Sequence, residues 1–509
     1  MRLRLPAAAL AVALGLAAVT APTATATPRP HAPKAPASHA RAAAALDRAQ
    51  AVVSGHSRGK DATIALRDLW ASMDALSPAD RGRARALLAR PTLPSAKVRC
   101  KKTICIHYTT SGKNAVSRRD VSPHNGTPDY VDLALKTVLR IHDVYVTAGY
   151  REPLPDKGKS GSSALDVFLQ DDGAKGLYGY CAPDQNTPQG VYTSYSYCSF
   201  DNDFKHSQFP TNTPKTNLQV TAAHEYFHAT QFSYDAYEDS WILEATATWA
   251  EDELYPDVND NLQYLPDGPI GAPDLPLDYA QGCCHQYGDW IFFRYLTEEF
   301  NDEQGGLPSL ILHLWQRLDA KAGVGPDDYS VQGIENVLAD LGTSLPEQLG
   351  YFAVANRYPS LAYTEGQLYP TADATEVDVT SGAQDPAAFS RSLDHLSTAT
   401  VRYVPEGLSE DNRRLQLAFD LAPTARGSFA VIAYEKTNGQ VEVSGVTLDA
   451  NGDANVSVGF DSDNVAGVEV TLVNAGSHYD CWTGGDFSCQ GDSTDDNLAE
   501  SVNALAYLS

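Results

Sequence analysis

The sequence predicts an α+β protein in which a small mixed sheet and a helical subdomain precede a C-terminal antiparallel β-sandwich. Two observations lead to this fold class. Up to Leu318 the chain mixes short strand patterns with segments whose apolar residues recur at helical spacing, at 128–150, 217–255 and 286–318. After Glu376, short β-rich segments separated by Gly, Asn and Asp turns take over, as is typical of a sandwich.

The first 26 residues have the pattern of a secretory signal peptide. A basic start, Met1-Arg2-Leu3-Arg4, precedes an apolar run from Pro6 to Val19, and Ala24-Thr25-Ala26 is a small-residue cleavage site. The apolar run is too short to cross a bilayer, and no later segment approaches the length that a spanning helix needs. We therefore expect a secreted, extracellular protein without a membrane anchor.

Residues 27–97 are predicted to form a Pro/Ala-rich tether and a basic, mostly helical segment. Four prolines before residue 45 predict a flexible tether, and helical spacing runs from Leu46 to about Ala89. The position of this segment, between signal peptide and body, is that of a propeptide. Such a segment would bind the rest of the chain in cis and keep an enzyme inactive until export.

Charge is distributed unevenly along the chain. The formal net charge is −26, yet residues 27–97 carry 12 Lys and Arg against 5 Asp and Glu, whereas residues 98–509 carry 24 against 59. A body this acidic repels nucleic-acid phosphates and anionic membranes, so we expect neither as a partner. The basic segment can pair with the body, or it can be a solvated linker.

We expect the body to divide near residue 376. Residues 98–376 would hold the mixed sheet and the helices, and residues 377–509 the sandwich. Strand patterns are found in the first part at 105–110, 165–169 and near 190–197, and in the second at 415–422, 428–435, 441–448, 454–460 and 467–474.

The eight cysteines are an even number, which predicts disulfides in an exported protein. Nearness in sequence pairs Cys100 with Cys105, Cys181 with Cys198, and Cys481 with Cys489. The adjacent Cys283 and Cys284 are left for each other, although a bond between neighbours is strained.

The segment AAHEYFHATQF, residues 222–232, has two histidines four positions apart. On a helix capped by Asn217, His224 and His228 lie on one face, from which both imidazoles can bind one zinc ion. Glu225 would flank the metal, where it can take a proton from water without being a ligand. The alternative is a core helix whose histidines bond to backbone carbonyls.

A third ligand is suggested by WILEATATWAE, residues 241–251. Glu244 lies there among apolar and small residues, where an unpaired buried carboxylate is strongly unfavourable. A zinc ion would satisfy it, and Ala245 and Ala247 would let the two helices approach closely. The alternative is a Glu244 that faces solvent.

These two segments together resemble the gluzincin zinc peptidases, whose pattern is HExxH followed by a helix with E-[GA]-x-A-x-x-x-E. More narrowly, residues 222–256 resemble a family of secreted bacterial metalloproteases with an AHExxHaxQ…WxxEaxAxWxED core, and the resemblance spans roughly residues 98–320. It implies a gluzincin-like metallopeptidase domain in which His224, His228 and Glu244 bind zinc and Glu225 is the general base.

The resemblance is incomplete at one position and leaves another role open. Many thermolysin-like members have an Asp four residues after the ligand glutamate to orient a histidine, but this chain has Thr248 there, and Glu251 is the candidate for that role. Related gluzincins use a tyrosine before an apolar helix to bond the developing oxyanion. Here Tyr287 or His285 would do so. The alternative is that Tyr287 is an ordinary residue of a helix start.

Two acidic loops, 201–203 and 257–260, are candidates for Ca²⁺, although carboxylates in so acidic a chain are usually solvated. The sequence as a whole predicts a zinc-dependent endopeptidase that acts on proteins or peptides. Two alternatives fit the same residues: a cell-envelope binding protein on a degenerate peptidase scaffold, and a zinc hydrolase of non-peptide amides or esters.

Overall fold

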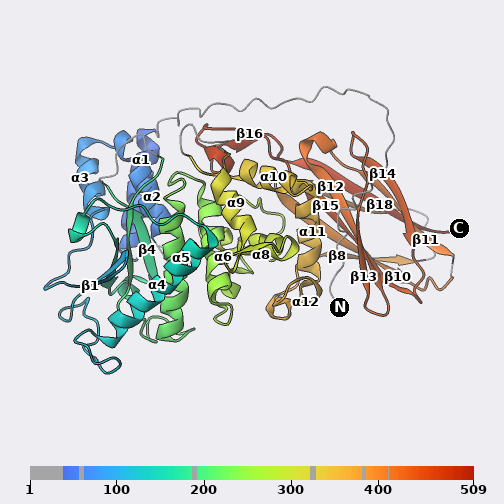
Figure 1. Ribbon diagram of the computed structural model, residues 1–509. Helices are drawn as coiled ribbons and strands as arrows, with labels where there is room; N and C mark the ends of the chain where they lie inside the picture. The colour runs from blue at the N-terminus through green and yellow to red at the C-terminus, as the bar shows by residue number, and fades with distance from the viewer. Residues whose placement is uncertain (1–37, 57–61, 186–191, 321–327, 381–385, 411) are drawn as a thin grey trace, which may run out of the picture.

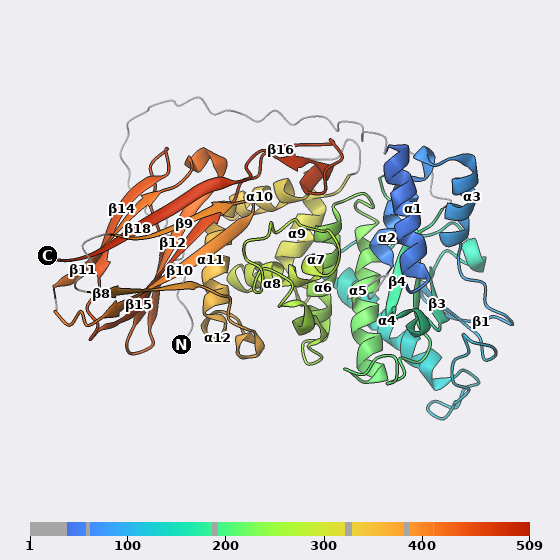
Figure 2. The same ribbon diagram turned by 180° about the vertical axis from the view of Figure 1, so that it is seen from behind.

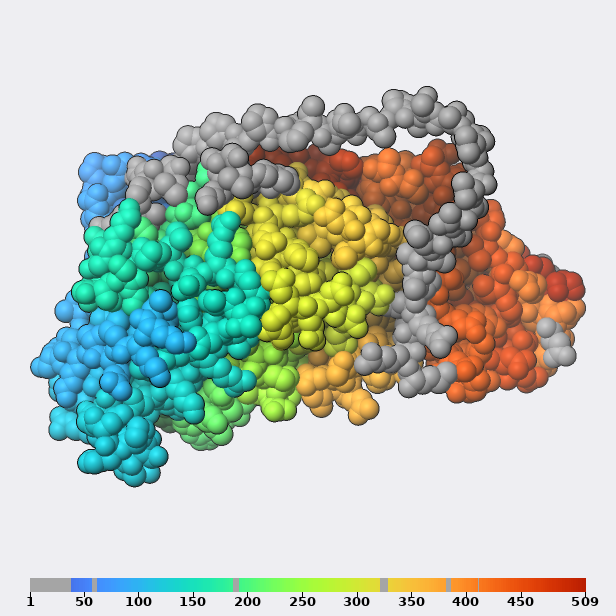
Figure 3. All heavy atoms as spheres, in the orientation of Figure 1, coloured from blue at the N-terminus to red at the C-terminus, as the bar shows by residue number. Residues whose placement is uncertain are grey.

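The computed structural model describes residues 38–56, 62–185, 192–320, 328–380, 386–410 and 412–509. The predicted signal peptide and the first part of the predicted tether lie outside these ranges. The described chain is α+β with several sheets, as expected. It is elongated, with a mixed sheet at one end, helices in the middle and a sandwich at the other end (Figure 1). The space-filling view shows these parts in contact, in chain order (Figure 3).

The described residues before the first strand, 38–56 and 62–96, form several helices. We call this part of the chain the leader. Its longer helices are α1 (His39–Val53), α2 (Thr63–Ala71) and α3 (Pro78–Leu87).

The leader begins its helical structure earlier than the prolines suggest. Helix α1 already starts at His39, so the flexible tether predicted up to residue 45 is wrong for its last residues. The reason is that this stretch is rich in alanine, the strongest helix former, and buries Ala42 and Leu46. Helix α3 starts where Pro78 at the first helical position predicts, with Ser77 as its cap.

A five-stranded mixed sheet follows the leader. Its strand order is β1-β2-β3-β5-β4, with the three inner strands parallel and each edge strand antiparallel to its neighbour. The strands are β1 (Lys97–Lys101), β2 (Ile104–Tyr108), β3 (Leu165–Gln170), β4 (Gly179–Pro183) and β5 (Ser196–Asp201). Strand β4 therefore lies at an edge, although it comes before β5 in the chain.

The two faces of this sheet are covered by different helices (Figure 2). Helices α4 (Asp129–Ala148) and α5 (Pro214–Gln231) pack on one face, where Val167 shares their apolar cluster. The leader covers the other face, where Phe168 and Tyr180 pack with its buried apolar residues. Successive side chains of a strand point to opposite faces, which is why one strand contributes to both layers.

The middle of the molecule is helical. The predicted helical block 217–255 consists of two helices, α5 and α6, which the loop 232–239 separates. The predicted block 286–318 is interrupted by a small hairpin that turns at Gly305-Gly306. The elements of this region are α6 (Ser240–Leu254), α7 (His285–Gly288), α8 (Trp290–Glu299), β6 (Glu303–Gln304), β7 (Leu307–Pro308), α9 (Ser309–Arg317), α10 (Val331–Asp340), α11 (Leu345–Arg357) and α12 (Pro359–Ala362).

Two sheets form the C-terminal sandwich, in the orders β13-β12-β15-β10-β8 and β14-β11-β18-β9. All pairs are antiparallel except β8 with β10, which is parallel and departs from the wholly antiparallel sandwich predicted. The strands are β8 (Thr375–Thr380), β9 (Ala387–Leu393), β10 (Ser397–Glu406), β11 (Arg413–Asp420), β12 (Ser428–Lys436), β13 (Val441–Gly445), β14 (Asp453–Gly459), β15 (Val465–Asn474) and β18 (Leu498–Leu508).

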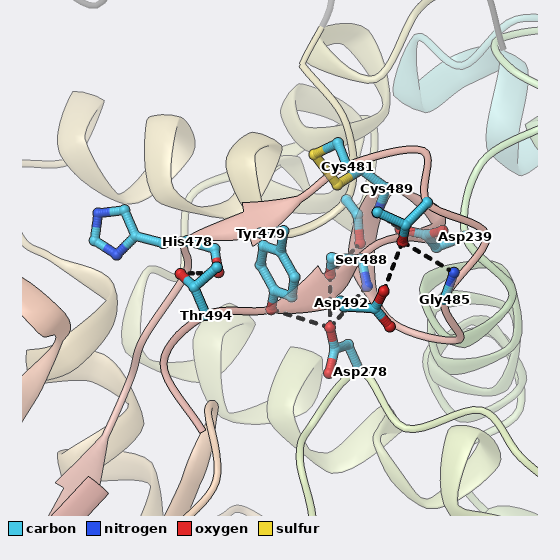
Figure 4. The surroundings of a disulfide bond; sticks show 12 residues. Asp239, Asp278, His478, Tyr479, Cys481, Gly485, Ser488, Cys489, Asp492 and Thr494 are labelled. Carbon is cyan, nitrogen blue, oxygen red and sulfur yellow. Dashed lines mark hydrogen bonds between the residues drawn. A yellow bond between two sulfur atoms is a disulfide. The ribbon is translucent and has the colours of Figure 1, made fainter. Parts of the chain in front are cut away.

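A loop of the C-terminal part reaches back to the helices (Figure 4). It lies between β16 (Tyr479–Asp480) and β17 (Asp492–Ser493). Asp278 accepts hydrogen bonds from the Ser488 N–H at 2.9 Å and from the Tyr479 hydroxyl at 3.0 Å. Asp239, the residue that precedes α6, accepts the N–H of Cys489 at 2.8 Å. The sandwich is thereby attached to the start of α6.

The cysteine pairing agrees with the pattern predicted from sequence separation. Disulfides join Cys100 to Cys105, Cys181 to Cys198, Cys283 to Cys284, and Cys481 to Cys489, and none of the described cysteines is free. Among the helices in the described ranges, none combines the length and apolar character that crossing a membrane requires.

Candidate metal centre

The first histidine helix, α5, begins three residues before the predicted cap Asn217. Thr213 is the cap: its hydroxyl accepts the N–H of Thr216 at 3.2 Å, and the Thr216 hydroxyl accepts the N–H of Thr213 at 3.0 Å. Pro214 takes the first helical position, where an N–H is not needed. The prediction of Asn217 as cap is wrong because Thr213 offers a reciprocal pair of bonds one turn earlier.

Three buried side chains from two helices meet at one point. His224 and His228 come from α5, and Glu244 comes from α6. His224 Nε2 lies 3.0 Å from His228 Nε2 and 3.1 Å from Glu244 Oε2, and His228 Nε2 lies 3.5 Å from the same oxygen. This buried group could hold a metal ion.

The spacing of these atoms fits a tetrahedral ion. Ligand atoms about 2.0–2.1 Å from a zinc ion in tetrahedral geometry lie about 3.3 Å from one another. The three distances above are close to that value. The second oxygen of Glu244, Oε1, is buried and makes no hydrogen bond within the described part of the chain. A cation at this point would satisfy a carboxylate that is otherwise only partly paired.

The outer nitrogen of each imidazole is also positioned. His224 Nδ1 lies 2.8 Å from Glu251 Oε1, and His228 Nδ1 lies 2.7 Å from Gln231 Oε1. Donation of Nδ1–H to these oxygens leaves the Nε2 lone pairs directed at the shared point. Glu251, and not Thr248, therefore takes the orienting position.

Gln231 was not among the residues singled out from the sequence, although its position offers a signal. It lies three residues after His228, on the same helical face. Its amide donates to the Leu243 carbonyl at 2.9 Å and to the Thr246 hydroxyl at 3.0 Å. These bonds fix which end of the amide faces His228, so the carbonyl oxygen is the atom that the imidazole meets.

The electrostatics of this group favour an ionised Glu244 and a positively charged His224. Burial alone disfavours the charge on Glu244, but the two imidazoles outweigh it and lower the pKa of Glu244 to about 2. Burial also opposes charge on His224, yet Glu244 and Glu251 raise the pKa of His224 well above its ordinary value. Without a metal, the site stabilises positive charge among its carboxylates, which is what a cation site requires.

Glu225, the predicted base, is buried and faces the leader. Its Oε2 accepts a hydrogen bond of 2.9 Å from the hydroxyl of Thr63, the first residue of α2. Glu225 also lines a pocket with His224, and the aromatic side chains of Tyr178, Tyr264 and Tyr287 form much of its wall.

The structure separates the two candidates for oxyanion binding. The Tyr287 ring stacks on Tyr264 with centroids 5.0 Å apart, and its centroid is 6.1 Å from that of His224. His285 instead directs Nδ1 at the Asp267 carbonyl, 2.8 Å away, and is not among the residues that line the pocket. Burial lowers the pKa of His285. The structure thus brings Tyr287, but not His285, to the metal centre.

The acidic loops considered for Ca²⁺ use their carboxylates in hydrogen bonds. Asp201 is buried and accepts the N–H groups of Gly173 and Phe204, and Asp260 accepts the Asn212 amide at 2.7 Å. Within the described ranges, the histidines and Glu244 are the one group of three such ligands close enough to hold an ion. Calcium binding at these loops stays a prediction.

Comparison with known proteins gives no family for this chain. Neither a protein-family model nor a curated protein matches it. Among solved structures, a periplasmic inhibitor of g-type lysozyme from Aeromonas hydrophila matches with 9% identity and a TM-score of 0.15, over 26% of this chain and 100% of its own. A family GH115 4-O-methyl-α-glucuronidase matches with 6% identity and a TM-score of 0.14, over 71% of this chain and 54% of its own.

Proposed function

We propose that the chain is a secreted zinc-dependent endopeptidase of the gluzincin type, like the bacterial metalloproteases that its HEYFH and WILEATATWAE segments resemble. The observation that carries the proposal is the convergence of two Nε2 atoms and one carboxylate oxygen, from His224, His228 and Glu244, in a buried site with the spacing of zinc ligands. Four disulfides support the proposal that the chain is secreted, because such bonds persist in oxidising compartments.

The roles of the residues follow from their positions. Zinc bound by the three ligands would supply the Lewis acidity that lowers the pKa of a water molecule and polarises a peptide carbonyl. Glu225 would accept a proton from the attacking water and pass it to the leaving amine as the C–N bond breaks. The Tyr287 phenol, in the same pocket, would donate a hydrogen bond to the developing oxyanion.

The test combines metal analysis with casein cleavage by wild type, Glu225→Gln and the control Glu303→Gln, which changes an exposed glutamate of β6. We expect one zinc per chain in all three proteins. Cleavage should fall about 100-fold or more in Glu225→Gln, because removal of a general base has effects of this order, and stay unchanged in the control.

Other results would point to other functions. Casein cleavage that persists in Glu225→Gln would show that Glu225 is not the general base. Bound zinc without cleavage of casein or of a peptide library, but with turnover of simple amides or esters, would favour a non-peptide hydrolase. Absence of all hydrolysis would favour a binding protein on a peptidase scaffold.

A further inference from the structure

The leader covers the sheet next to the metal centre. Leu66 and Leu69 of α2 are buried in a cluster with Phe168, Tyr180 and Tyr197 of the sheet. Figure 2 shows α1 and α2 in front of β4, between the viewer and the sheet. Two basic side chains of the leader, Arg67 and Arg90, also bond to the acidic body.

Thr63 of the leader joins the edge strand to the predicted base. Its side-chain oxygen accepts the N–H of Cys181, in the middle of β4, at 2.9 Å, and its hydroxyl donates to Glu225 Oε2 at 2.9 Å. Thr63 is fully buried. It also begins α2, so the positive end of that helix adds to the stabilisation of the Glu225 carboxylate.

Arg67, one turn later, connects α2 to the helix of the third ligand. Its guanidinium is buried and donates to the carbonyls of Ala236 and Glu238 and, at 2.8 Å, to the hydroxyl of Ser240. Ser240 is the first residue of α6, which carries Glu244. Helix α2 therefore extends from the edge of β4 to the start of α6, across the side of the site that Glu225 faces.

We propose that the leader is a built-in inhibitor that occupies, through Thr63 and α2, the place along β4 where a peptide substrate binds. This inference rests on the proposed peptidase function. An extended peptide adds to a sheet edge by pairing with its free N–H and C=O groups. The Thr63 oxygen takes one such N–H, that of Cys181, in the way a substrate carbonyl would.

The same contact also blocks the base. A carboxylate oxygen that already accepts a hydroxyl at 2.9 Å is not free to accept a proton from water at that position. Release of the leader would vacate the β4 edge and Glu225 together. The active form of the enzyme is thus the form in which α2 has left the β4 edge and Glu225.

The experiment uses the full-length, zinc-loaded chain and two pairs of variants. Thr63→Val keeps the shape of the side chain but removes its hydrogen bonds, and Thr63→Ser keeps the hydroxyl. Arg67→Ala removes the bonds to the start of α6. Arg48→Ala is its matched control, because Arg48 also pairs with Asp68 but is largely exposed.

Two quantities are measured: hydrolysis of a quenched fluorescent peptide library, and the rate of zinc transfer to a chromophoric chelator. We expect at least a tenfold rise in both quantities for Thr63→Val and for Arg67→Ala, because weaker docking of α2 raises the population in which the β4 edge and Glu225 are uncovered. Thr63→Ser and Arg48→Ala should behave as wild type.

Each result separates this inference from the proposed function. A fall in hydrolysis for Thr63→Val, with wild-type rates in Thr63→Ser, would overturn the inhibitor and make Thr63 a positioning residue of an active enzyme. Equal zinc-transfer rates in all variants would also overturn it. If no variant hydrolyses peptides, the peptidase proposal fails. Zinc transfer that is faster in Thr63→Val but not in Thr63→Ser would then still show that the leader covers the metal site.

Discussion

At the scale of single residues, the orientation of each imidazole depends on one neighbour. Gln231 contacts His228 Nδ1 and is itself fixed by bonds to the Leu243 carbonyl and the Thr246 hydroxyl. A metal-ligating histidine whose Nδ1–H has such an acceptor presents a fixed tautomer and a fixed ring plane to the ion. The ring of His228 would otherwise have to find its binding orientation during each binding event.

We therefore expect Gln231→Ala to weaken zinc binding about 10- to 100-fold, the usual effect of losing an outer partner of a metal ligand. Competition titration against a chelator of known affinity measures it. Gln332→Ala, at an exposed position of α10, is the control and should leave affinity unchanged. Wild-type affinity in Gln231→Ala would show that the helix alone orients His228.

At the scale of elements, the leader is joined to the sheet by a buried cluster of charges. Arg90, at the end of the leader, pairs with Asp184 at 2.9 Å, with Asp156 at 2.8 Å and with Asp166. These three carboxylates are almost completely buried and come from β3 and from the loops around the sheet. One guanidinium thus contacts three acidic groups that lie close together, and His107 Nε2 also lies 2.6 Å from Asp166.

Arg90→Met should destabilise the protein by about 3–5 kcal/mol, because removing one partner of a buried ion pair leaves uncompensated charge. The measurement is the free energy of unfolding in urea at pH 7. Arg85→Met changes an exposed arginine of α3 and should shift this free energy by less than about 0.5 kcal/mol. An equally small effect of Arg90→Met would mean that water enters the cluster and replaces the cation.

At the scale of the whole molecule, a histidine joins the sandwich to the helical region. His395, just after β9, lies 2.9 Å from Asp278 through Nε2 and 2.5 Å from Asp496 through Nδ1. Asp278 also binds the loop closed by Cys481 and Cys489 (Figure 4). Burial opposes charge on His395, but the two carboxylates outweigh it and raise the pKa of His395 to about 9.

This pKa predicts a loss of stability at alkaline pH. Because the folded-state pKa lies above the unfolded value of about 6.5, the contribution of His395 is complete below that pH and is lost as pH rises towards about 9. The loss should amount to about 3 kcal/mol. The free energy of unfolding in urea, measured across this pH range, should fall more steeply for wild type than for His395→Gln. The control His206→Gln, which changes an exposed histidine, should behave as wild type. Parallel curves would exclude a charged His395.

Much of the local structure could be predicted because its signals are local. The helix at 129–148 lies where its repeat of 3.6 residues places it, because that repeat records which side of a helix is buried. The strand at 165–170 lies where a short apolar run bounded by Gly and Ser predicts one. Predictions failed where two local signals compete, as at Asn217, where a better cap lies a few residues earlier. The parallel pairing of β8 with β10 carries no local signal.

The sequence alone determined that His224 and His228 share a helical face, with Glu225 beside them, because residues four apart on a helix are neighbours whatever surrounds it. The tertiary structure decided what meets that face. The distance of 3.1 Å from His224 to Glu244 depends on how α6 packs on α5, and the contact of Thr63 with Glu225 joins residues 162 positions apart. Such contacts depend on the packing of whole layers, which no short stretch of sequence specifies.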